Sequence, residues 1–151
     1  MGSDQERARR AGFEHVLGIV GWGAAAEELF CDGRQLQLSQ RVLDGAAGIE
    51  GVRQYGDPSA AGRLPHIVCL GIDGIEPQAV LLGLDQAGIA VHSGSACASE
   101  DLQPSPVLEA MGVDAHRSLR VSVGWDTTEA DVDAFLTALP DVIGRLRQLS
   151  R

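Results

Sequence analysis

The stretch Ser93-Gly94-Ser95-Ala96-Cys97-Ala98-Ser99-Glu100 places a cysteine among small and hydroxyl-bearing residues, shortly after the apolar run Ala87-Gly88-Ile89-Ala90-Val91. A structural cysteine usually lies among bulky apolar residues, whereas a reactive one needs solvent access, freedom to move and help in forming a thiolate. The pattern therefore predicts that Cys97 is presented on a loop that follows a buried segment. A free surface cysteine in a turn is the alternative that these residues alone leave open.

Two further segments follow this loop in a fixed order. The first is Pro104-Ser105-Pro106-Val107-Leu108-Glu109-Ala110-Met111-Gly112, and the second is Arg117-Ser118-Leu119-Arg120-Val121-Ser122-Val123-Gly124. Together with the cysteine loop they resemble the NifS-like cysteine desulfurases, and the resemblance runs from about Gln5 to Leu149. Three motifs in the correct order are far more specific than one motif alone.

The resemblance implies an α/β fold, namely the small C-terminal domain of the fold-type-I transferases that depend on pyridoxal phosphate. We expect a short mixed sheet covered by helices, with an extra helical segment at the N-terminus. Residues 1–33 are expected to form that segment, which resembles the end of the family's large domain. Residues 34–151 are expected to form the small domain, with the persulfide loop at 93–105.

The resemblance also implies a chemical role for the cysteine. In the family, a loop thiolate attacks the sulfur of L-cysteine, which leaves alanine and an enzyme-bound persulfide. Cys97 matches this nucleophile. The loop must move, because the same sulfur has to reach the cofactor and then an external acceptor. The small residues that match the catalytic loop are Ser93, Gly94, Ser95, Ala96 and Ser99.

Arg120 matches the family arginine that holds the substrate's carboxylate. This task suits a planar, permanently charged group that can bind two oxygens at once. The alternative for Arg120 is an exposed strand arginine in an ion pair with a neighbouring acid. We expect that plain role for Arg117.

The chain has no lysine, because all twelve of its basic residues are arginine. Family members hold pyridoxal phosphate as a Schiff base on a lysine of a larger N-terminal domain. Arginine stays protonated and cannot form this bond. The chain therefore resembles half of an enzyme and should be inactive alone. Its expected partners are a polypeptide with the pyridoxal domain or a full-length desulfurase, a sulfur-acceptor protein and L-cysteine, and homo-oligomer formation stays open.

Composition excludes several classes of protein. The 151 residues are 44% hydrophobic and 22% charged, which suits one globular domain with a real core. The formal charge of −9 argues against nucleic-acid binding. The apolar runs are too short for a membrane span and no secretory leader pattern opens the chain, so we expect a cytoplasmic protein.

Cysteines at 31, 69 and 97 have no CxxC spacing, which predicts neither a disulfide framework nor a metal site. Cys69 is expected to be structural.

Apolar periodicity and turn residues predict the remaining elements. We expect helices over 16–29, 36–47, 77–88 and 106–111, and strands over 52–55, 66–72, 89–91 and 119–123. Leu119, Val121 and Val123 should face the core, with Arg120 and Ser122 on the opposite face. A final helix should start at a capping box of Thr128 and Asp131. Pro140 predicts a kink near Thr137 to Pro140, or two abutting helices.

Three positions remain open or depart from the resemblance. His92 could lower the pKa of Cys97, or it could simply satisfy local polar groups at a strand end. His66 stands where relatives often carry asparagine, and we assign it no role. Phe13 stands where relatives usually carry a threonine whose hydroxyl reaches the cofactor phosphate of the partner subunit, and a phenyl ring cannot donate that hydrogen bond.

The leading interpretation is thus the sulfur-carrying part of a cysteine desulfurase. One rival is a non-catalytic interaction module that keeps the fold and binds sulfur acceptors or a full-length desulfurase. Another is a persulfide relay protein that accepts sulfur from another enzyme through Cys97. The substitution Cys97→Ser separates these functions, because it abolishes catalysis or relay and leaves scaffold binding unchanged.

Overall fold

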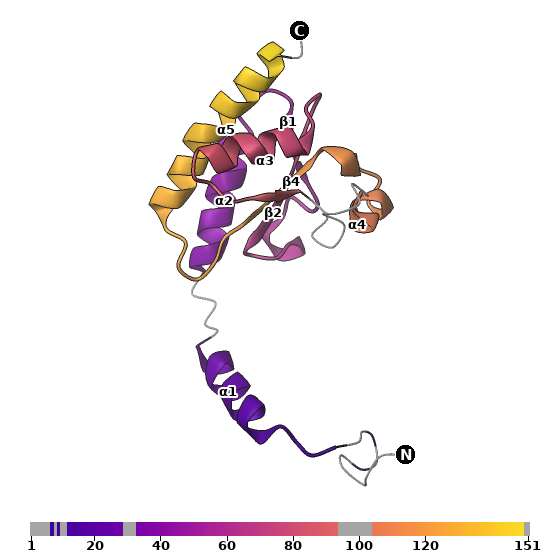
Figure 1. Cartoon of the computed structure of the whole chain (residues 1–151), viewed down its shortest axis with the longest axis vertical. Helices are drawn as coiled ribbons and strands as arrows, with labels where there is room; N and C mark the ends of the chain where they lie inside the picture. The colour runs from indigo at the N-terminus through magenta and orange to yellow at the C-terminus, as the bar shows by residue number, and fades with distance from the viewer. Residues whose placement is uncertain (1–6, 8, 10–11, 29–32, 94–103, 150–151) are drawn as a thin grey trace. The chain divides into compact units, whose positions relative to one another are not determined.

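The computed structural model describes residues 7, 9, 12–28, 33–93 and 104–149. The chain divides into two compact units, Met1–Asp32 and Gly33–Arg151. The first unit contains helix α1 (Val16–Glu27), whose large apolar side chains are exposed. The predicted end of this helix at Leu29 lies outside the described residues. The second unit holds the sheet and the other helices (Figure 1).

A four-stranded sheet with the order β1-β2-β4-β3 forms the middle of the second unit. The strands are β1 (Val52–Tyr55), β2 (Ile67–Ile72), β3 (His92–Ser93) and β4 (Ser118–Ser122). Every neighbouring pair is antiparallel. The α/β class is confirmed, but the expected mixed sheet is wrong. The strands β2 and β3 do run parallel across helix α3, yet β4 lies between them and is antiparallel to both, so no parallel pair forms.

Three helices cover one face of the sheet, namely α2 (Arg34–Ala46), α3 (Pro77–Gln86) and α5 (Glu129–Leu149) (Figure 1). Helix α3 ends as predicted, because Gly88 has a φ of +78° and the Ile89 N–H donates to the Leu84 carbonyl at 2.9 Å. In the described part of the chain, no helix is both long and apolar enough to cross a membrane.

Side chains alternate along β4 as predicted. Leu119 and Val121 are buried in the core, whereas Arg120 is half-buried and Ser122 is exposed. The deepest apolar side chains of the core are Val42, Leu70, Val80, Leu84, Leu119, Leu139 and Ile143. Burying each of these side chains contributes about 1.5–3 kcal/mol. Helix–sheet packing of this kind stabilises this face of the sheet.

The predicted strand over 89–91 is wrong, since β3 begins only at His92. Ile89 and Val91 still pack against the main core as partly buried residues. Their side chains therefore satisfy the apolar pattern that predicted a strand. The main chain of this segment leaves the β4 ladder, whose last pair on this side is His92 with Arg120.

Helix α5 begins with the predicted capping box. The Thr128 N–H donates to Asp131 Oδ2 at 2.8 Å, and the Asp131 N–H donates to Thr128 Oγ1 at 3.2 Å. The expectation of two abutting helices is wrong, because α5 is one continuous helix with Pro140 inside it. Leu139 and Ile143, on either side of this proline, are both buried in the core, which offsets the hydrogen bond that proline removes.

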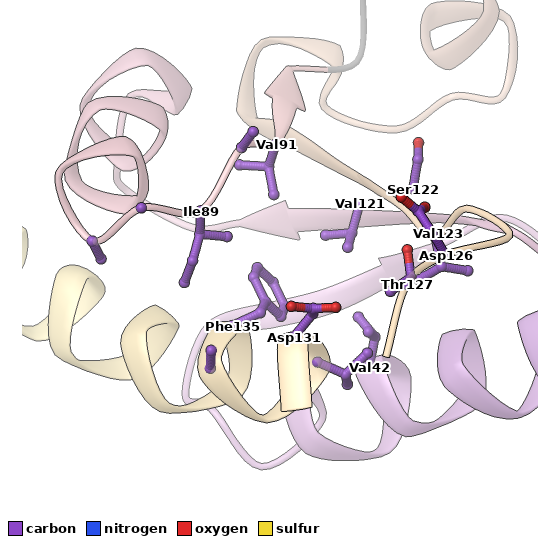
Figure 2. Close-up of a pocket in the computed structure, with 15 residues that line it drawn as sticks. Val42, Ile89, Val91, Val121, Ser122, Val123, Asp126, Thr127, Asp131 and Phe135 are labelled. Carbon is purple, nitrogen blue, oxygen red and sulfur yellow. The ribbon is translucent and has the colours of Figure 1, made fainter. Parts of the chain in front are cut away.

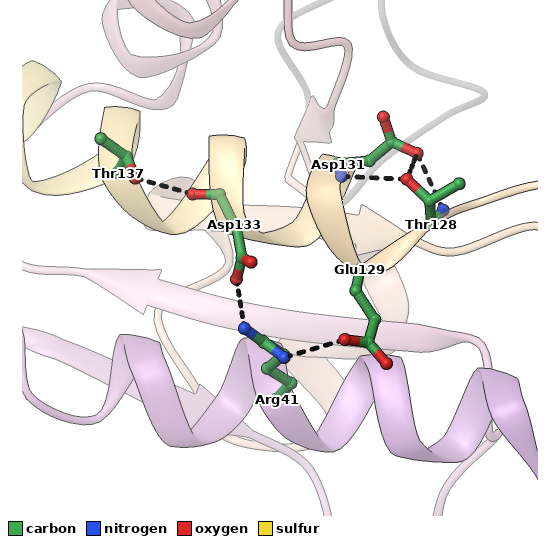
Figure 3. A network of polar contacts seen from close by, with 6 residues as sticks. All are labelled: Arg41, Thr128, Glu129, Asp131, Asp133 and Thr137. Atoms are coloured by element: carbon green, nitrogen blue, oxygen red, sulfur yellow. Dashed lines mark hydrogen bonds and ion pairs between the residues drawn. The ribbon is translucent and has the colours of Figure 1, made fainter.

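An exposed ionic network joins α2 to α5 (Figure 3). The Arg41 guanidinium contacts Glu129 at 3.5 Å and Asp133 at 2.6 Å. Thr137 Oγ1 donates to the Asp133 carbonyl at 2.8 Å, one turn further along the helix. Exposed pairs of this kind contribute about 0–1 kcal/mol each. The network therefore fixes the pairing of the two helices more than it stabilises them.

The opposite face of the sheet has a smaller cover. It is formed by α4 (Pro106–Ala110) and the 3-10 turn η2 (Ala115–Arg117), while the 3-10 turn η1 (Ala60–Gly62) lies in the connection from β1 to β2. Tyr55, Leu108 and Ala115 form a second buried cluster, against which Cys69 and Val113 pack. The site described next lies on this face.

Candidate functional site

Four side chains form a row across the sheet on the face opposite the main core. In the strand register, His92 of β3 lies opposite Arg120 of β4, Arg120 lies opposite Cys69 of β2, and Cys69 lies opposite Tyr55 of β1. Directly opposed residues on antiparallel strands project from the same face, with Cβ atoms about 4.5–5.5 Å apart. The sheet register therefore surrounds Arg120 with an imidazole on one side and a thiol on the other.

Arg120 has the properties of an anion-binding group. Its side chain is half-buried, and its Nε atom is buried without a hydrogen-bond partner among the described residues. A buried donor left unpaired costs about 1–3 kcal/mol. A carboxylate bound to the guanidinium would remove this cost, because arginine presents its N–H groups as a planar fork. The role of Arg120 as a carboxylate anchor stays a prediction, which this geometry allows.

The alternative of a plain ion pair applies to a different arginine. Arg117 Nε lies 3.5 Å from Asp114 Oδ2 at the surface, as the sequence predicted. Arg53 pairs with Asp73 beside the end of β1. Within the described ranges, no ion pair involves Arg120. The guanidinium of Arg120 is therefore available for a ligand in this part of the chain.

Cys69 lies in the row next to Arg120, which the sequence interpretation did not foresee. Burial raises the pKa of the Cys69 thiol, and the positive charge of Arg120 opposes this shift. The thiol is therefore protonated at neutral pH, which suits a structural cysteine. The alternation of Val68 and Leu70, which both face the main core, was the signal that could have placed Cys69 on the other face.

Tyr55 closes the far end of the row. Its side chain is only 8% exposed, and burial raises the pKa of its phenol. The ring lies over Gly71, where an added Cβ would come within 2.3 Å of Tyr55 Cζ. Glycine at 71 is therefore what allows the tyrosine ring to cross β2 and cover the cysteine end of the row.

His92 closes the near end of the row. Its Nδ1 lies 2.6 Å from the Ser93 carbonyl oxygen. A carbonyl only accepts hydrogen bonds, so Nδ1 carries the proton of this contact. This contact agrees with the interpretation of His92 as a residue that satisfies local polar groups. A role in lowering the pKa of Cys97 stays a prediction, because Cys97 is outside the described residues.

The structure describes the predicted site residues only in part. Arg120 and Ser93 are described, and Ser93 pairs with Leu119 at the end of β3. Gly94, Ser95, Ala96, Cys97 and Ser99 lie outside the described residues. The chain is described again from Pro104, and buried Ser105 precedes α4. Ser93, the last described residue before the predicted persulfide loop, is one residue beyond the partner of Arg120.

No metal centre is built by the described ranges, which contain no cluster of three or more His, Cys, Asp or Glu side chains suited to an ion. A pyridoxal Schiff base does not fit these residues either. It needs a lysine amine, and all twelve basic residues of the chain are arginine. Among the described residues, the buried Nε of Arg120 stays the candidate for contact with a ligand.

Comparisons with known proteins identify the family of the chain. Residues 2–135 match the family model described as aminotransferase class-V. The chain belongs to the class-V aminotransferase family. Within this family, the chain is 41% identical to the cysteine desulfurase IscS 1 of Archaeoglobus fulgidus and 43% identical to a cysteine desulfurase of Cereibacter sphaeroides. Both alignments cover 99% of the chain.

A solved structure supports the same class-V assignment. The NifS-like protein from Rickettsia africae matches 95% of this chain with a TM-score of 0.73 and 28% identity. This class-V chain spans 41% and 40% of the two curated relatives and 39% of the solved chain. The similarity therefore identifies a cysteine desulfurase-like domain of the family and covers well under half of the intact enzymes.

Proposed function

We propose that this chain is the sulfur-carrying domain of a cysteine desulfurase, in which Arg120 binds the carboxylate of L-cysteine and Cys97 receives its sulfur. The observation that carries the proposal is the buried Nε of Arg120, which has no hydrogen-bond partner among the described residues. Arg120 lies on the strand next to the one that leads into the Cys97 loop. Similarity to cysteine desulfurases over 99% of the chain supports it. The sulfur then passes from Cys97 to an acceptor protein.

The first task of the chain in this reaction is to hold the substrate. The guanidinium of Arg120 binds both oxygens of the carboxylate, and Cys69 and His92 border it in the row. Neutral Cys69 adds no competing charge to this site, since burial keeps its thiol protonated. A substrate anchored here by one end keeps its sulfur free to meet a thiolate from the loop.

The second task is sulfur transfer. The Cys97 thiolate attacks the substrate sulfur, so that an S–S bond forms while the C–S bond breaks and its electron pair stays with the substrate carbon. The carbon then takes a proton and leaves as alanine. Because Ser93 is held in the sheet beside the strand of Arg120, the loop begins next to the anchored carboxylate. The loop's small residues suit the return of the sulfur to an acceptor.

The activation of the C–S bond needs a group that this chain does not provide. Pyridoxal phosphate supplies an electron sink in the intact enzymes, and it requires a lysine. With no lysine in these 151 residues, that lysine must lie outside them. The proposed assembly therefore joins a pyridoxal-binding partner to the sulfur-carrying domain described here.

The decisive experiment recovers this assembly from the native host by a tag on the chain. Visible absorbance reports the bound cofactor, mass spectrometry reports a +32 Da persulfide on Cys97, which is about the mass of one sulfur atom, and sulfide release from L-cysteine reports turnover. We expect Cys97→Ser to abolish both the persulfide and the sulfide. Cys31→Ser is the matched control and should retain both, because Cys31 belongs to none of the three motifs. Unchanged sulfide release by Cys97→Ser would refute the proposal.

A second candidate is a non-catalytic interaction or persulfide-relay module, which Phe13 favours. Its ring is 91% exposed, and it stands at the position where relatives usually carry the phosphate-contacting threonine. A relay takes sulfur from a full-length desulfurase and not from L-cysteine. Incubation of the chain with a persulfide-loaded desulfurase distinguishes a relay from an interaction module. A relay gains a persulfide on Cys97 in this experiment, and an interaction module gains none.

A further inference from the structure

A cleft of about 370 Å³ lies on the helix-covered side of β4, away from the Arg120 row. Figure 2 shows Ile89 and Val91 on one wall, Val121 on β4, and Phe135 and Asp131 on helix α5. The cleft opens where the segment 89–91 leaves the ladder of β4. This volume falls in the range of about 300–1,000 Å³ that is usual for ligand pockets.

The main chain of Ser122 points into this cleft. The Val123 N–H donates to the His66 carbonyl at 2.9 Å, which places residue 123 on the β2 side of the ladder. Main-chain groups of successive residues in an antiparallel ladder alternate between the two sides. The N–H and carbonyl of Ser122 therefore point away from β2, toward the side where a further strand would pair.

No segment of the described chain completes this pairing. The β3 ladder stops at Arg120, two residues before Ser122, and no backbone hydrogen bond joins Ser122 to the described residues 89–91. Beyond the cleft, the Gly124 N–H is already bonded to Thr127 Oγ1 at 2.8 Å. Ser122 is thus a short open sheet edge, flanked by a closed ladder on one side and a closed turn on the other.

The lining of the cleft combines an apolar floor with an acidic rim. Val42, Val121 and Phe135 supply apolar surface. Asp126 and Asp131 are both exposed carboxylates, and no lining residue is basic. The hydrogen bonds from Thr128 hold the pKa of Asp131 below its ordinary value, so this rim is negative at neutral pH. The cleft therefore favours a ligand that is apolar on one side and cationic on the other.

We propose that this cleft binds an extended segment of a partner polypeptide that carries apolar and basic side chains. The segment pairs its main chain with Ser122 as an added strand, which is a common mode of peptide recognition. Successive side chains of an extended strand point to opposite faces, so apolar residues can lie against Phe135 while a lysine or arginine reaches Asp126. The inference is independent of the chemistry of Cys97.

The test uses the full chain and a fluorescent, capped peptide of alternating valine and lysine. Fluorescence anisotropy should show saturable binding that weakens with salt. Ser122→Pro removes the N–H that faces the cleft and leaves the β2 ladder intact, so the peptide should bind about threefold to tenfold more weakly. Ser122→Ala keeps the main chain and is the matched control, with affinity unchanged. Asp126→Asn should weaken binding and reduce the salt dependence.

A peptide methylated on alternate amide nitrogens provides a second arm, which also decides the matter if Ser122→Pro fails to fold by circular dichroism. It should bind more weakly than the parent peptide, and a peptide with glutamate in place of lysine should not bind. Equal affinity of the parent and methylated peptides would overturn strand pairing. Light scattering that shows a dimer of the chain, lost in Ser122→Pro and not displaced by peptide, would overturn the proposed occupant in favour of a second copy.

Discussion

Arg120 lies directly opposite His92 in the antiparallel ladder between β4 and β3, and the residue after His92 is Ser93, the root of the Cys97 loop. The pairing of β3 with β4 thus connects Arg120, the proposed carboxylate anchor, to the start of the proposed sulfur-carrying loop. Helices α3 and α5 hold this part of the sheet from the other face, where Leu119 is fully buried. A change in the core below would therefore shift the anchor and the loop root together.

Replacing Arg120 tests its role as the carboxylate anchor. In the assembly with the pyridoxal-binding partner, Arg120→Ala should raise KM for L-cysteine about 10- to 100-fold, because hydrogen bonds between charged groups contribute about 1.5–3 kcal/mol. Arg120→Lys should recover only part of the loss, since a lysine cannot form the planar fork. Steady-state kinetics measure both variants.

Arg117→Ala is the matched control for this prediction. Arg117 pairs with Asp114 at the surface, and the loss of such a pair changes stability by about 0–1 kcal/mol. KM should stay at the wild-type value in this variant. An equal rise of KM in Arg117→Ala and Arg120→Ala would mean that general electrostatics, and not a bound carboxylate, explains the effect.

The thiol of Cys69 should titrate above its ordinary range and respond to Arg120. Burial raises its pKa, and the Arg120 charge lowers it, so Arg120→Gln should raise the pKa further. Because the folded-state pKa of Cys69 is raised, its protonated thiol favours the folded chain, and this contribution to the free energy of unfolding is complete below the unfolded-state pKa. The contribution is lost as the pH rises through the folded-state pKa. The rate of iodoacetamide labelling against pH, in a chain with Cys31→Ser and Cys97→Ser, measures the shift.

Two outcomes of the labelling experiment would contradict this account. One is fast labelling of Cys69 at neutral pH in the folded chain, which requires an exposed thiolate. The other is a lower pKa in Arg120→Gln than in the parent chain, which would mean that Arg120 does not face the thiol. Labelling in denaturant supplies the unfolded reference in both cases.

Gly71→Ala should destabilise the fold through a clash with Tyr55. The added Cβ would lie within 2.3 Å of Tyr55 Cζ, so the ring must move from its buried position. Overpacking of this kind costs about 1–3 kcal/mol in the free energy of unfolding, measured by urea denaturation. If the clash is the cause, the cost of Gly71→Ala should largely disappear in a Tyr55→Ala background. An equal cost in both backgrounds would locate the strain elsewhere.

Thr128→Ala should weaken the start of α5. The substitution removes the hydroxyl that accepts from the Asp131 N–H and donates to its carboxylate, which costs about 1 kcal/mol for an N-cap residue. The same hydrogen bonds lower the pKa of Asp131. Their contribution is therefore present above the unfolded-state pKa near 3.8 and is lost as the pH falls through the lower folded-state value. Thermal unfolding at pH 7 and below pH 3.8 measures the difference.

At pH 7, Thr128→Ser is the control for this prediction, because serine keeps the capping hydroxyl and should retain the wild-type stability. The stability difference between Thr128→Ala and the parent chain should shrink in acid as Asp131 becomes protonated. A difference that grows as the pH falls would contradict the assigned hydrogen bonds.

The sequence by itself determined the family and the helices that cover the sheet, and it pointed to two candidate site residues. Helical spacing predicted α2, α3 and α5, and alternation along β4 placed Arg120 on the face opposite Leu119. These features depend on local periodicity and on motifs whose residues are close in the chain, and for that reason they are visible before folding. The positions of Arg120 and Cys97 in such motifs identified them as candidates in the same way.

Only the tertiary structure decided the order of the strands and the neighbours of the site. Nothing local shows that β4 lies between β2 and β3, and this order makes the sheet antiparallel and brings Cys69 and His92 beside Arg120. The late start of β3 at His92 has the same origin, since Ile89 and Val91 keep their apolar contacts without a strand partner. Strand pairing is a contact between distant segments, and it is set by packing over the whole sheet, not by the sequence of either strand.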